Sequence, residues 1–179
     1  MKKNNESILV LAFPKISVKD YKWIQSIRGK YDKTFYHVVE PHFTIVFPVF
    51  NYDLKYINNY IKKIVKNVKP IKFSIRGATT VKDSFSDGTD VFLIPDEGNS
   101  DIIKLHDKLY TEVLFKELRL DIPFIPHIAI GRGKDAFESK KIADKINGNE
   151  FLINGIVDEL TLVEYEYPKV KTINKFLLL

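Results

Sequence analysis

The polar and apolar residues of this chain follow two kinds of repeating pattern. In the first kind, apolar residues alternate with polar ones or form short runs rich in β-branched residues, which predicts strands. The alternation is clearest between residues 71 and 76, and an apolar run begins close to the N-terminus. We expect strands at Ser7–Phe13, His42–Phe47, Ile71–Arg76, Val91–Ile94, His127–Gly131, Phe151–Ile153, Glu159–Tyr165 and Thr172–Leu178.

In the second kind of pattern, apolar residues recur at helical spacing. The segment 53–68 has apolar residues on one side and lysines on the other, and Pro70 stops it, as expected of an amphipathic helix. The Ser-, Asp- and Gly-rich stretch Lys82–Thr89 is short enough for a hairpin loop. We expect helices at Ser17–Arg28, Asp53–Val68, Ser100–Leu118 and Ala136–Ile146.

The order of these elements is similar in the two halves of the chain. Each half contains a strand that begins with histidine, then a helix, then further strands. This weak internal duplication predicts an α+β protein with two pseudo-symmetric lobes of antiparallel sheet, flanking helices and a cleft between the lobes. Because no linker separates the halves, we expect one bilobal domain over residues 1–179.

Two matching motifs carry the candidate chemistry. They are Pro41-His42-Phe43-Thr44-Ile45 and Pro126-His127-Ile128-Ala129-Ile130. Because residues two apart share a strand face, His42 lies beside Thr44, and His127 lies beside Ala129. The apolar residues between them face the core and fix the register, so both histidines should lie on the face turned away from the core.

Two such histidines can perform acid–base chemistry on a phosphodiester. A neutral imidazole accepts a proton from water or a hydroxyl, and an imidazolium donates one to a leaving oxygen. The Thr44 hydroxyl can donate a hydrogen bond to a non-bridging phosphate oxygen. We therefore expect His42 and His127 to be catalytic and Thr44 to bind phosphate, with no metal and no cofactor.

At these residues the sequence resembles the two-histidine (2H) phosphoesterase superfamily, which includes 2′-5′ RNA ligase-like proteins and cyclic phosphodiesterases. That superfamily carries two His-x-Thr/Ser-x motifs, one on each of two pseudo-symmetric lobes. The order of the segments Ile8–Phe13, Val91–Leu109 and Asp158–Leu162 around the motifs is also similar. The resemblance implies hydrolysis or ring-opening of a 2′,3′-cyclic phosphate, or cleavage or joining of a 2′-5′ phosphodiester, by His42 and His127 without a metal.

One position departs from the superfamily pattern. Ala129 stands where the second motif has Thr or Ser, so its side chain cannot donate a hydrogen bond and its backbone alone is a candidate for phosphate binding. Arg132 is a further phosphate-binding candidate. Strict alternation places it opposite His127, and a break at Gly131 or Gly133 would bring it round to the same face.

Other polar and aromatic residues have simpler structural explanations. We expect Lys72 and Arg76 to lie on a solvated strand face and His106 to be a core histidine, while His37 has no identifiable partner. Tyr165 and Tyr167 are able to stack on a base, but sheet-face packing is the simpler explanation in a chain with nine tyrosines.

Composition narrows the class of protein further. An apolar fraction of 45% indicates an ordered globular protein, and the net charge of +5 suits an anionic ligand such as a nucleotide or an RNA terminus. The chain has no cysteine and no apolar run near the roughly 20 residues that a membrane span needs. We expect a cytoplasmic monomer without a membrane partner.

Two alternatives stay open. The same cleft could hold RNA ends or nucleotides without turnover, because the second motif lacks its hydroxyl. The duplication could also be accidental, in which case the two imidazoles would lie more than about 10 Å apart, too far to reach one phosphate.

Overall fold

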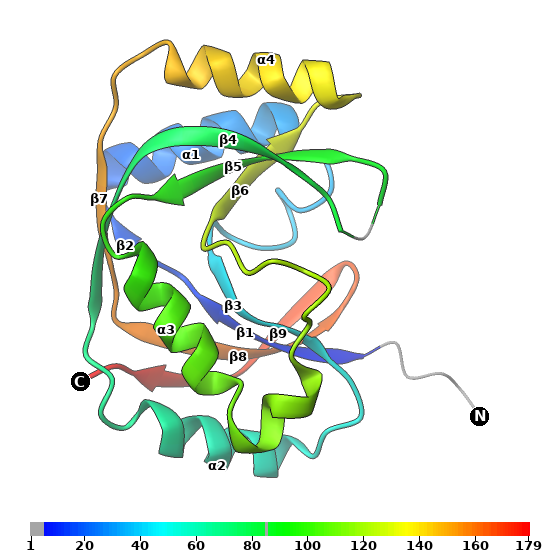
Figure 1. Ribbon diagram of the computed structural model, residues 1–179, viewed down its shortest axis with the longest axis vertical. Coiled ribbons are helices and arrows are strands. Elements are labelled where there is room, and N and C mark those ends of the chain that lie inside the picture. Colours follow the sequence, from blue (N-terminus) through cyan, green and yellow to red (C-terminus); the bar gives the residue numbers. More distant parts are fainter. Residues whose placement is uncertain (1–5, 85) are drawn as a thin grey trace.

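Two antiparallel sheets form the two lobes of the protein (Figure 1). The computed structural model describes residues 6–84 and 86–179. One sheet has the order β3-β1-β8-β9 and the other β2-β7-β4-β5-β6. The first is built from β1 (Ser7–Ala12), β3 (Phe43–Val49), β8 (Glu159–Glu166) and β9 (Lys169–Leu177). The second is built from β2 (Lys15–Ile16), β4 (Ile71–Lys82), β5 (Thr89–Pro95), β6 (Ile128–Arg132) and β7 (Ile153–Val157).

Helices cover the outer side of each sheet. In Figure 1, α1 (Val18–Tyr31) and α4 (Ala136–Asn147) lie with the sheet of the upper lobe, and α4 contacts β4 and β5. The lower lobe carries α2 (Leu54–Val65), α3 (Asn99–Leu109) and a short 3₁₀ helix, η1 (Glu112–Glu117). The predicted α+β architecture of two antiparallel sheets with flanking helices is confirmed.

Side-chain caps explain where three of the helices begin. Ser17, Asp53 and Asp135 each accept a hydrogen bond from the backbone amide three residues ahead, which satisfies one of the free donors of a first helical turn. The predicted end of the first helix at Arg28 is wrong. Helix α1 passes through Gly29 to Tyr31, and the buried ion pair between Arg28 and Asp32 lies at its end.

The predicted helix from Ser100 to Leu118 is also wrong in part. Helix α3 ends at Leu109, and η1 follows after a break at which Glu112 has a positive φ of 45°. The Tyr60 hydroxyl donates to the Leu109 carbonyl at 2.9 Å, so a side chain from α2 satisfies one of the terminal carbonyls of α3. The end of α3 is thus stabilised by a contact from another helix, and the periodicity of the sequence does not predict this contact.

Strands β4 and β7 differ in length from the strands predicted there. Strand β4 continues past Arg76 to Lys82, because its outer half pairs with β5 up to Lys82 opposite Thr89. The strand expected at Phe151–Ile153 begins only at Ile153 and continues to Val157, where it pairs with β4. In both cases the partner strand determines the bounds.

The two motif strands occupy equivalent places, because β3 and β6 each form one edge of a sheet. Phe43 and Ile45 on β3, and Ile128 and Ile130 on β6, are buried in the hydrophobic core. The residues between them therefore point to the opposite face of each sheet, as the motif pattern predicts.

Candidate active site

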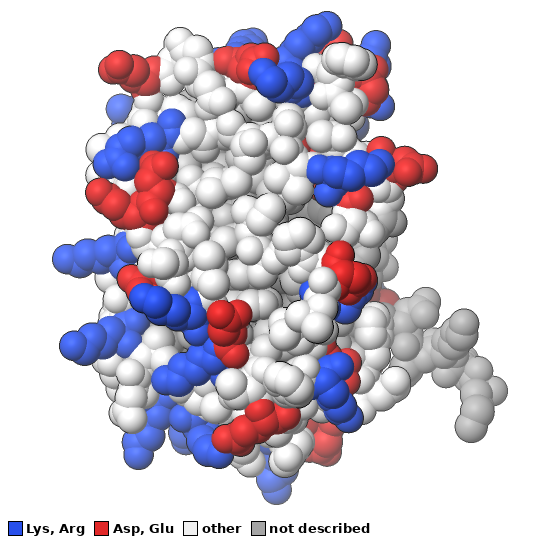
Figure 2. Space-filling view, viewed as in Figure 1, with Lys and Arg blue, Asp and Glu red and all other residues white. Residues whose placement is uncertain are grey.

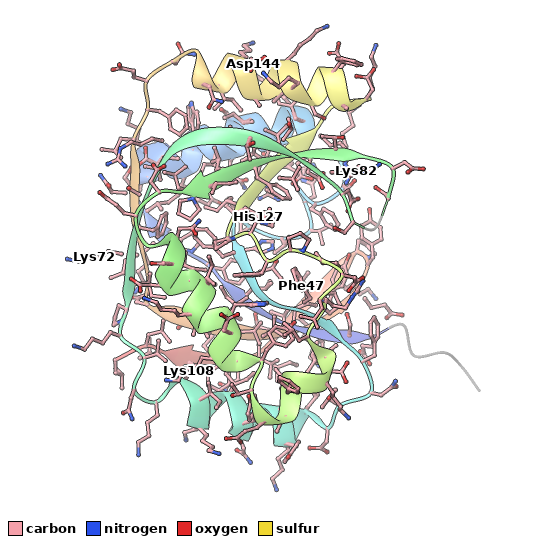
Figure 3. All side chains as sticks on the ribbon, viewed as in Figure 1. Phe47, Lys72, Lys82, Lys108, His127 and Asp144 are labelled. Atoms are coloured by element: carbon pink, nitrogen blue, oxygen red, sulfur yellow. The ribbon has the colours of Figure 1, made fainter. Side chains whose placement is uncertain are left out.

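His42 and His127 each stand immediately before the first residue of an edge strand. His42 precedes β3, and His127 precedes β6. The proline before each histidine is buried and the histidine itself is half-buried. Figure 3 shows His127 near the centre of the molecule, between the two lobes.

Both imidazoles make the same hydrogen bond. His42 Nδ1 lies 2.7 Å from the Glu40 carbonyl, and His127 Nδ1 lies 2.6 Å from the Ile125 carbonyl. A carbonyl oxygen can only accept a hydrogen bond. Each Nδ1 therefore carries a hydrogen and donates a hydrogen bond to the carbonyl oxygen two residues back. The intervening proline has its φ fixed near −65° and holds the preceding residue extended, which sets the position of that carbonyl. In the neutral ring, Nε2 is therefore left as the acceptor that is free for chemistry.

Aromatic rings flank both histidines. The Phe92 ring on β5 stacks on His127, with the ring centroids 3.6 Å apart and the planes 10° apart. Phe13 follows β1, and its ring centroid lies 5.9 Å from that of His42, with the two ring planes at 58°. These rings keep water from one side of each imidazole, and they restrain the His127 ring more closely than the His42 ring.

The surroundings favour neutral imidazoles in the free protein. Burial lowers the pKa of His42, and the charge of Arg28 adds to the effect, while the hydrogen bond to Glu40 opposes it. Burial lowers the pKa of His127 to about 4. The charge of a protonated His42 lowers it further, so the two imidazoles are linked electrostatically. Each of the two predicted residues immediately precedes an edge strand, one in each sheet.

Thr44 begins a row of paired residues that crosses three neighbouring strands on one face of the sheet. It pairs with Leu11 on β1, and Leu11 pairs with Thr161 on β8. The Thr44 hydroxyl has no hydrogen-bond partner among the residues that the structure describes. Thr161 is 1% exposed, and its hydroxyl also lacks a hydrogen-bond partner among the described residues. Thr44 therefore has a donor available for a ligand.

Ala129 occupies the position in β6 that corresponds to Thr44. It pairs with Phe92 on β5 and is exposed, so its methyl group faces open space. Because β6 is an edge strand, the backbone amides on its free side are not used by a neighbouring strand. These amides are the donors that this half of the site retains.

Arg132 is brought to the face of Ala129 by a break in β6. The register shifts by one residue between Ala129 and Gly131, so Arg132 pairs with Asp90. Its guanidinium donates to Asp90 at 2.8 Å, to Asp83 at 2.7 Å and to Ser86 at 2.8 Å. These contacts tie the β4–β5 loop to the end of β6, and they occupy the groups with which Arg132 would bind a phosphate.

A buried arginine organises the segment that leads to His42. Arg28 on α1 donates to Asp32 and to the carbonyls of Phe35 and Val39, at distances from 2.8 to 3.1 Å. The Gln25 side chain donates to the Glu40 carboxylate at 3.2 Å. Together these contacts hold the backbone of residues 32–40, including the carbonyl that orients His42.

The remaining candidates from the sequence lie outside this arrangement. Lys72 points outward from the edge of the molecule (Figure 3), and Arg76 pairs with Asp96 at 3.2 Å. His106 is buried, stacks on Phe124 and bonds to the Ile45 carbonyl, so it is a core histidine. His37 contacts Tyr36, and Tyr167 contacts Phe35, while Tyr165 is half-buried.

The face of the molecule seen in Figure 2 has few charges in its middle. In Figure 2, the middle of the face between the lobes carries few charged side chains, and Lys, Arg, Asp and Glu gather around it.

No group of three or more His, Cys, Asp or Glu residues that could hold a metal ion occurs in the described part of the chain. Within residues 6–84 and 86–179, no helix is long and apolar enough to cross a membrane.

Sequence reasoning missed the groups that surround the two histidines. Phe92, Phe13 and Thr161 reach the site through strand pairing, and a single sequence does not specify which strands pair. The carbonyls of Glu40 and Ile125 are backbone groups without a side-chain signature. The signal that was present is the proline before each histidine.

Comparison with known proteins identifies the family. Residues 16–168 match the family model of the 2′-5′ RNA ligase superfamily. The chain therefore belongs to this superfamily, whose members are 2H phosphoesterases.

Two curated relatives are bacterial. A candidate phosphoesterase of Bacillus licheniformis is 22% identical over 156 residues, which cover 86% of this chain and 87% of the relative. A candidate phosphoesterase of Bacillus pumilus is 27% identical over 125 residues, which cover 69% of this chain and 68% of the relative.

Solved structures show the same fold. A Thermus thermophilus protein superimposes with a TM-score of 0.60 at 14% identity and covers 96% of this chain and 97% of its own. Escherichia coli LigT, crystallised with 3′-AMP, gives a TM-score of 0.57 at 14% identity, with 97% of this chain and 98% of LigT covered. LigT has also been crystallised with NADP⁺ and with ATP.

Proposed function

We propose that this chain is a metal-independent phosphodiesterase that acts on a 2′,3′-cyclic phosphate or a 2′-5′ phosphodiester at the end of a nucleotide or RNA. The observation that carries the proposal is the repeated hydrogen bond from Nδ1 to the carbonyl two residues back, at His42 and at His127. It leaves Nε2 of both imidazoles without a hydrogen-bond partner among the described residues, and a charge on His42 lowers the pKa of His127. Such a pair supplies a proton acceptor and a proton donor for a single phosphorus centre.

For a 2′,3′-cyclic phosphate the reaction is a hydrolysis. One neutral imidazole accepts a proton at Nε2 from the attacking water as its oxygen bonds to phosphorus. The other imidazole, protonated, donates from Nε2 to the ribose oxygen as the bond between that oxygen and phosphorus breaks. The product is a ribose phosphate monoester with a free neighbouring hydroxyl, and the two imidazoles have exchanged protonation states. Proton exchange with water restores the starting pair.

The protein stabilises the negative charge on the phosphoryl oxygens unequally from its two lobes. On one side, the Thr44 hydroxyl donates to a non-bridging oxygen. On the other side, free amides near Ala129 take the place of a side-chain donor. A donor of this kind contributes about 10²–10³ in rate when it acts mainly in the transition state.

The nature of the ligand is supported by chemistry and by the relatives. The net charge of +5 favours an anionic substrate, and LigT, which has the same fold, has been crystallised with 3′-AMP. The superfamily is named for the 2′-5′ RNA linkage. These observations favour a ribonucleotide end over other phosphodiesters.

The test is turnover of 2′,3′-cyclic nucleotides and 2′-5′ dinucleotides in the presence of EDTA. We expect product from the unmodified protein and a loss of at least about 10³-fold in His42→Ala and in His127→Ala, because each removes one partner of the proton-transfer pair. His37→Ala is the matched control, since His37 lies outside the site. Near-normal turnover in His127→Ala would rule out the mechanism.

The exposed methyl of Ala129 favours a second candidate, a binding module that holds RNA ends without turnover. Binding of the same ligands without product under any condition, with and without EDTA and divalent cations, would establish that alternative. Product that persists with EDTA excludes it.

A further inference from the structure

A pocket lined by lysines lies at the far end of the second motif strand. It has a volume of about 380 Å³ and lies where the end of α1, the end of β6 and the helix α4 meet. We call it the lysine pocket. Its charged lining residues are Lys30, Lys33, Arg132, Lys134, Glu138, Lys141 and Lys145.

Most of the positive charge in the lysine pocket is not neutralised by the protein. Arg132 is bound by Asp83 and Asp90, and Lys141 is paired with Glu138 at 2.9 Å. The other four lysines, Lys30, Lys33, Lys134 and Lys145, are exposed and have no ion pair among the described residues. Cations that converge on a concave surface raise the local potential more than the same charges spread over a convex one.

The lysine pocket is connected to the catalytic residues by two segments. Strand β6 runs from Ile128, the residue after His127, to Arg132, and its five residues of extended chain span about 16 Å. On the other side, Lys33 lies in the segment that leads from α1 to His42. The backbone of Tyr31 packs against Gly131, which holds these two segments together. A linear polyanion with one end between the histidines therefore reaches the pocket along β6.

We propose that the lysine pocket binds backbone phosphates of an RNA chain whose terminal phosphate is in the active site. The inference rests on the proposed function and deepens it, because it makes an oligonucleotide the preferred substrate over a mononucleotide. Lysines act on phosphates as flexible point charges and require no fixed partner geometry, which matches a single strand of varying sequence. Tyr31 is the one aromatic residue in the pocket lining, against six lysine and arginine side chains, so the recognition is mainly electrostatic.

The experiment compares two substrates with the same reactive end. These are a nucleoside 2′,3′-cyclic phosphate and a hexanucleotide that ends in that group. We expect kcat/KM at low salt to be at least about tenfold higher for the hexanucleotide. In the variant K30Q/K33Q/K134Q/K145Q, this ratio should fall by at least about fivefold.

A matched control removes the same amount of charge elsewhere. Lys55, Lys62, Lys66 and Lys69 lie on or just after α2, are exposed and belong to the other lobe. The variant K55Q/K62Q/K66Q/K69Q should keep the ratio of the unmodified protein. Circular dichroism and thermal unfolding check that both variants are folded.

A binding measurement separates this inference from the proposed function. Dissociation constants for a fluorescein-labelled hexanucleotide are measured across a range of salt concentrations. Loss of four phosphate contacts should reduce the slope of log K against log salt by about 2 to 3, at roughly 0.7 per contact for a single strand. If neither substrate is turned over, the proposed function fails, and weaker binding by the pocket variant alone still supports the lysine pocket.

Two results would overturn the inference. One is equal hexanucleotide binding by the pocket variant and the control variant, whether or not turnover occurs. The other is that poly-glutamate displaces the labelled hexanucleotide as effectively as unlabelled RNA does, when the two competitors are compared at equal concentration of negative charge. The second result would assign the pocket to an acidic polypeptide.

Discussion

The Phe92 ring lies face to face with the His127 ring, at a centroid distance of 3.6 Å. This stack joins β5 to the beginning of β6, and it covers one side of the imidazole whose pKa burial lowers to about 4. The corresponding aromatic residue in the other lobe, Phe13, is farther from its histidine and tilted. The two half-sites thus share their hydrogen bonds and differ in their packing.

Replacing Phe92 by Ala should rehydrate His127. We expect the pKa of His127 to rise toward its ordinary value of 6.5 and kcat/KM to fall about tenfold, since an aromatic pair of this kind contributes about 0.5–1.5 kcal/mol. An NMR titration of the imidazole Cε1 proton measures the pKa. Phe13→Ala is the control and should move the pKa of His42 less. An unchanged His127 pKa in Phe92→Ala would contradict the assigned role of the stack.

Pro126 should be needed to orient His127. It is buried and lies between the histidine and Ile125, whose carbonyl accepts the hydrogen bond from Nδ1. Pro126→Ala frees φ at this position, so we expect a second imidazole tautomer to appear in ¹⁵N NMR spectra and kcat to fall several-fold. Pro123→Ala in the same loop removes an exposed proline and should leave the tautomer unchanged. A single tautomer in both variants would show that the proline has no such role.

Restoring a hydroxyl at position 129 should increase the rate. The Ala129 methyl is exposed, which leaves room for a larger side chain on an edge strand that favours β-branched residues. We expect Ala129→Thr to raise kcat about tenfold or more, since a positioned donor stabilises the transition state. Ala129→Val has a similar shape without the hydroxyl and should give no increase. Equal rates in the two variants would show that backbone donors already suffice.

The pH dependence of kcat/KM should reflect the lowered pKa values. Catalysis by the pair requires one protonated and one neutral imidazole, and burial holds the pKa of both His42 and His127 below the ordinary value of 6.5. The singly protonated pair of the free protein is therefore most populated below pH 6.5. We expect kcat/KM to peak there and to decline as the pH rises and the proton donor is lost. A maximum above about pH 7.5, measured on a cyclic nucleotide, would be inconsistent with this assignment.

A side chain at position 131 should destabilise the protein. Gly131 has a φ of 146°, and a Cβ atom there would lie 2.4 Å from the Cβ of Tyr31. We expect Gly131→Ala to lower the free energy of unfolding by about 2–4 kcal/mol, through backbone strain and overpacking. Gly77→Ala is the control, because the nearest atom to a Cβ there is 4.0 Å away, and it should change stability by less than about 1 kcal/mol. Denaturant titrations compare the two variants.

The sequence predicts the parts of this protein that depend on local periodicity. The alternation around Phe43 and Ile128 places both histidines correctly on the face away from the core. The sequence predicts that a break at Gly131 or Gly133 brings Arg132 to the face of His127, and the register shift next to Gly131 in β6 meets that condition. The carboxylates that bind Arg132 come from the β4–β5 loop (Asp83) and from β5 (Asp90), and no local sequence pattern links them to Arg132.

The features that the sequence does not predict are long-range contacts. The stack of Phe92 on His127 and the end of α3 at the Tyr60 hydroxyl both join residues that are distant along the chain. Arg28 is the last residue of a predicted helix, and the sequence does not predict that its side chain is buried and holds the segment before His42. Tertiary packing decides each of these contacts, and one sequence leaves that packing undetermined.

The Nδ1 hydrogen bond also bears on how such a protein diverges. Each imidazole takes its orientation from a carbonyl within the same three residues, Glu40 to His42 or Ile125 to His127. The orientation of each ring is therefore set by the backbone next to it, and the alanine at position 129 leaves the hydrogen bond of His127 intact. Loops, pockets and neighbouring side chains are then free to change in one lobe and adapt it to new ligands, while both rings keep the same orientation.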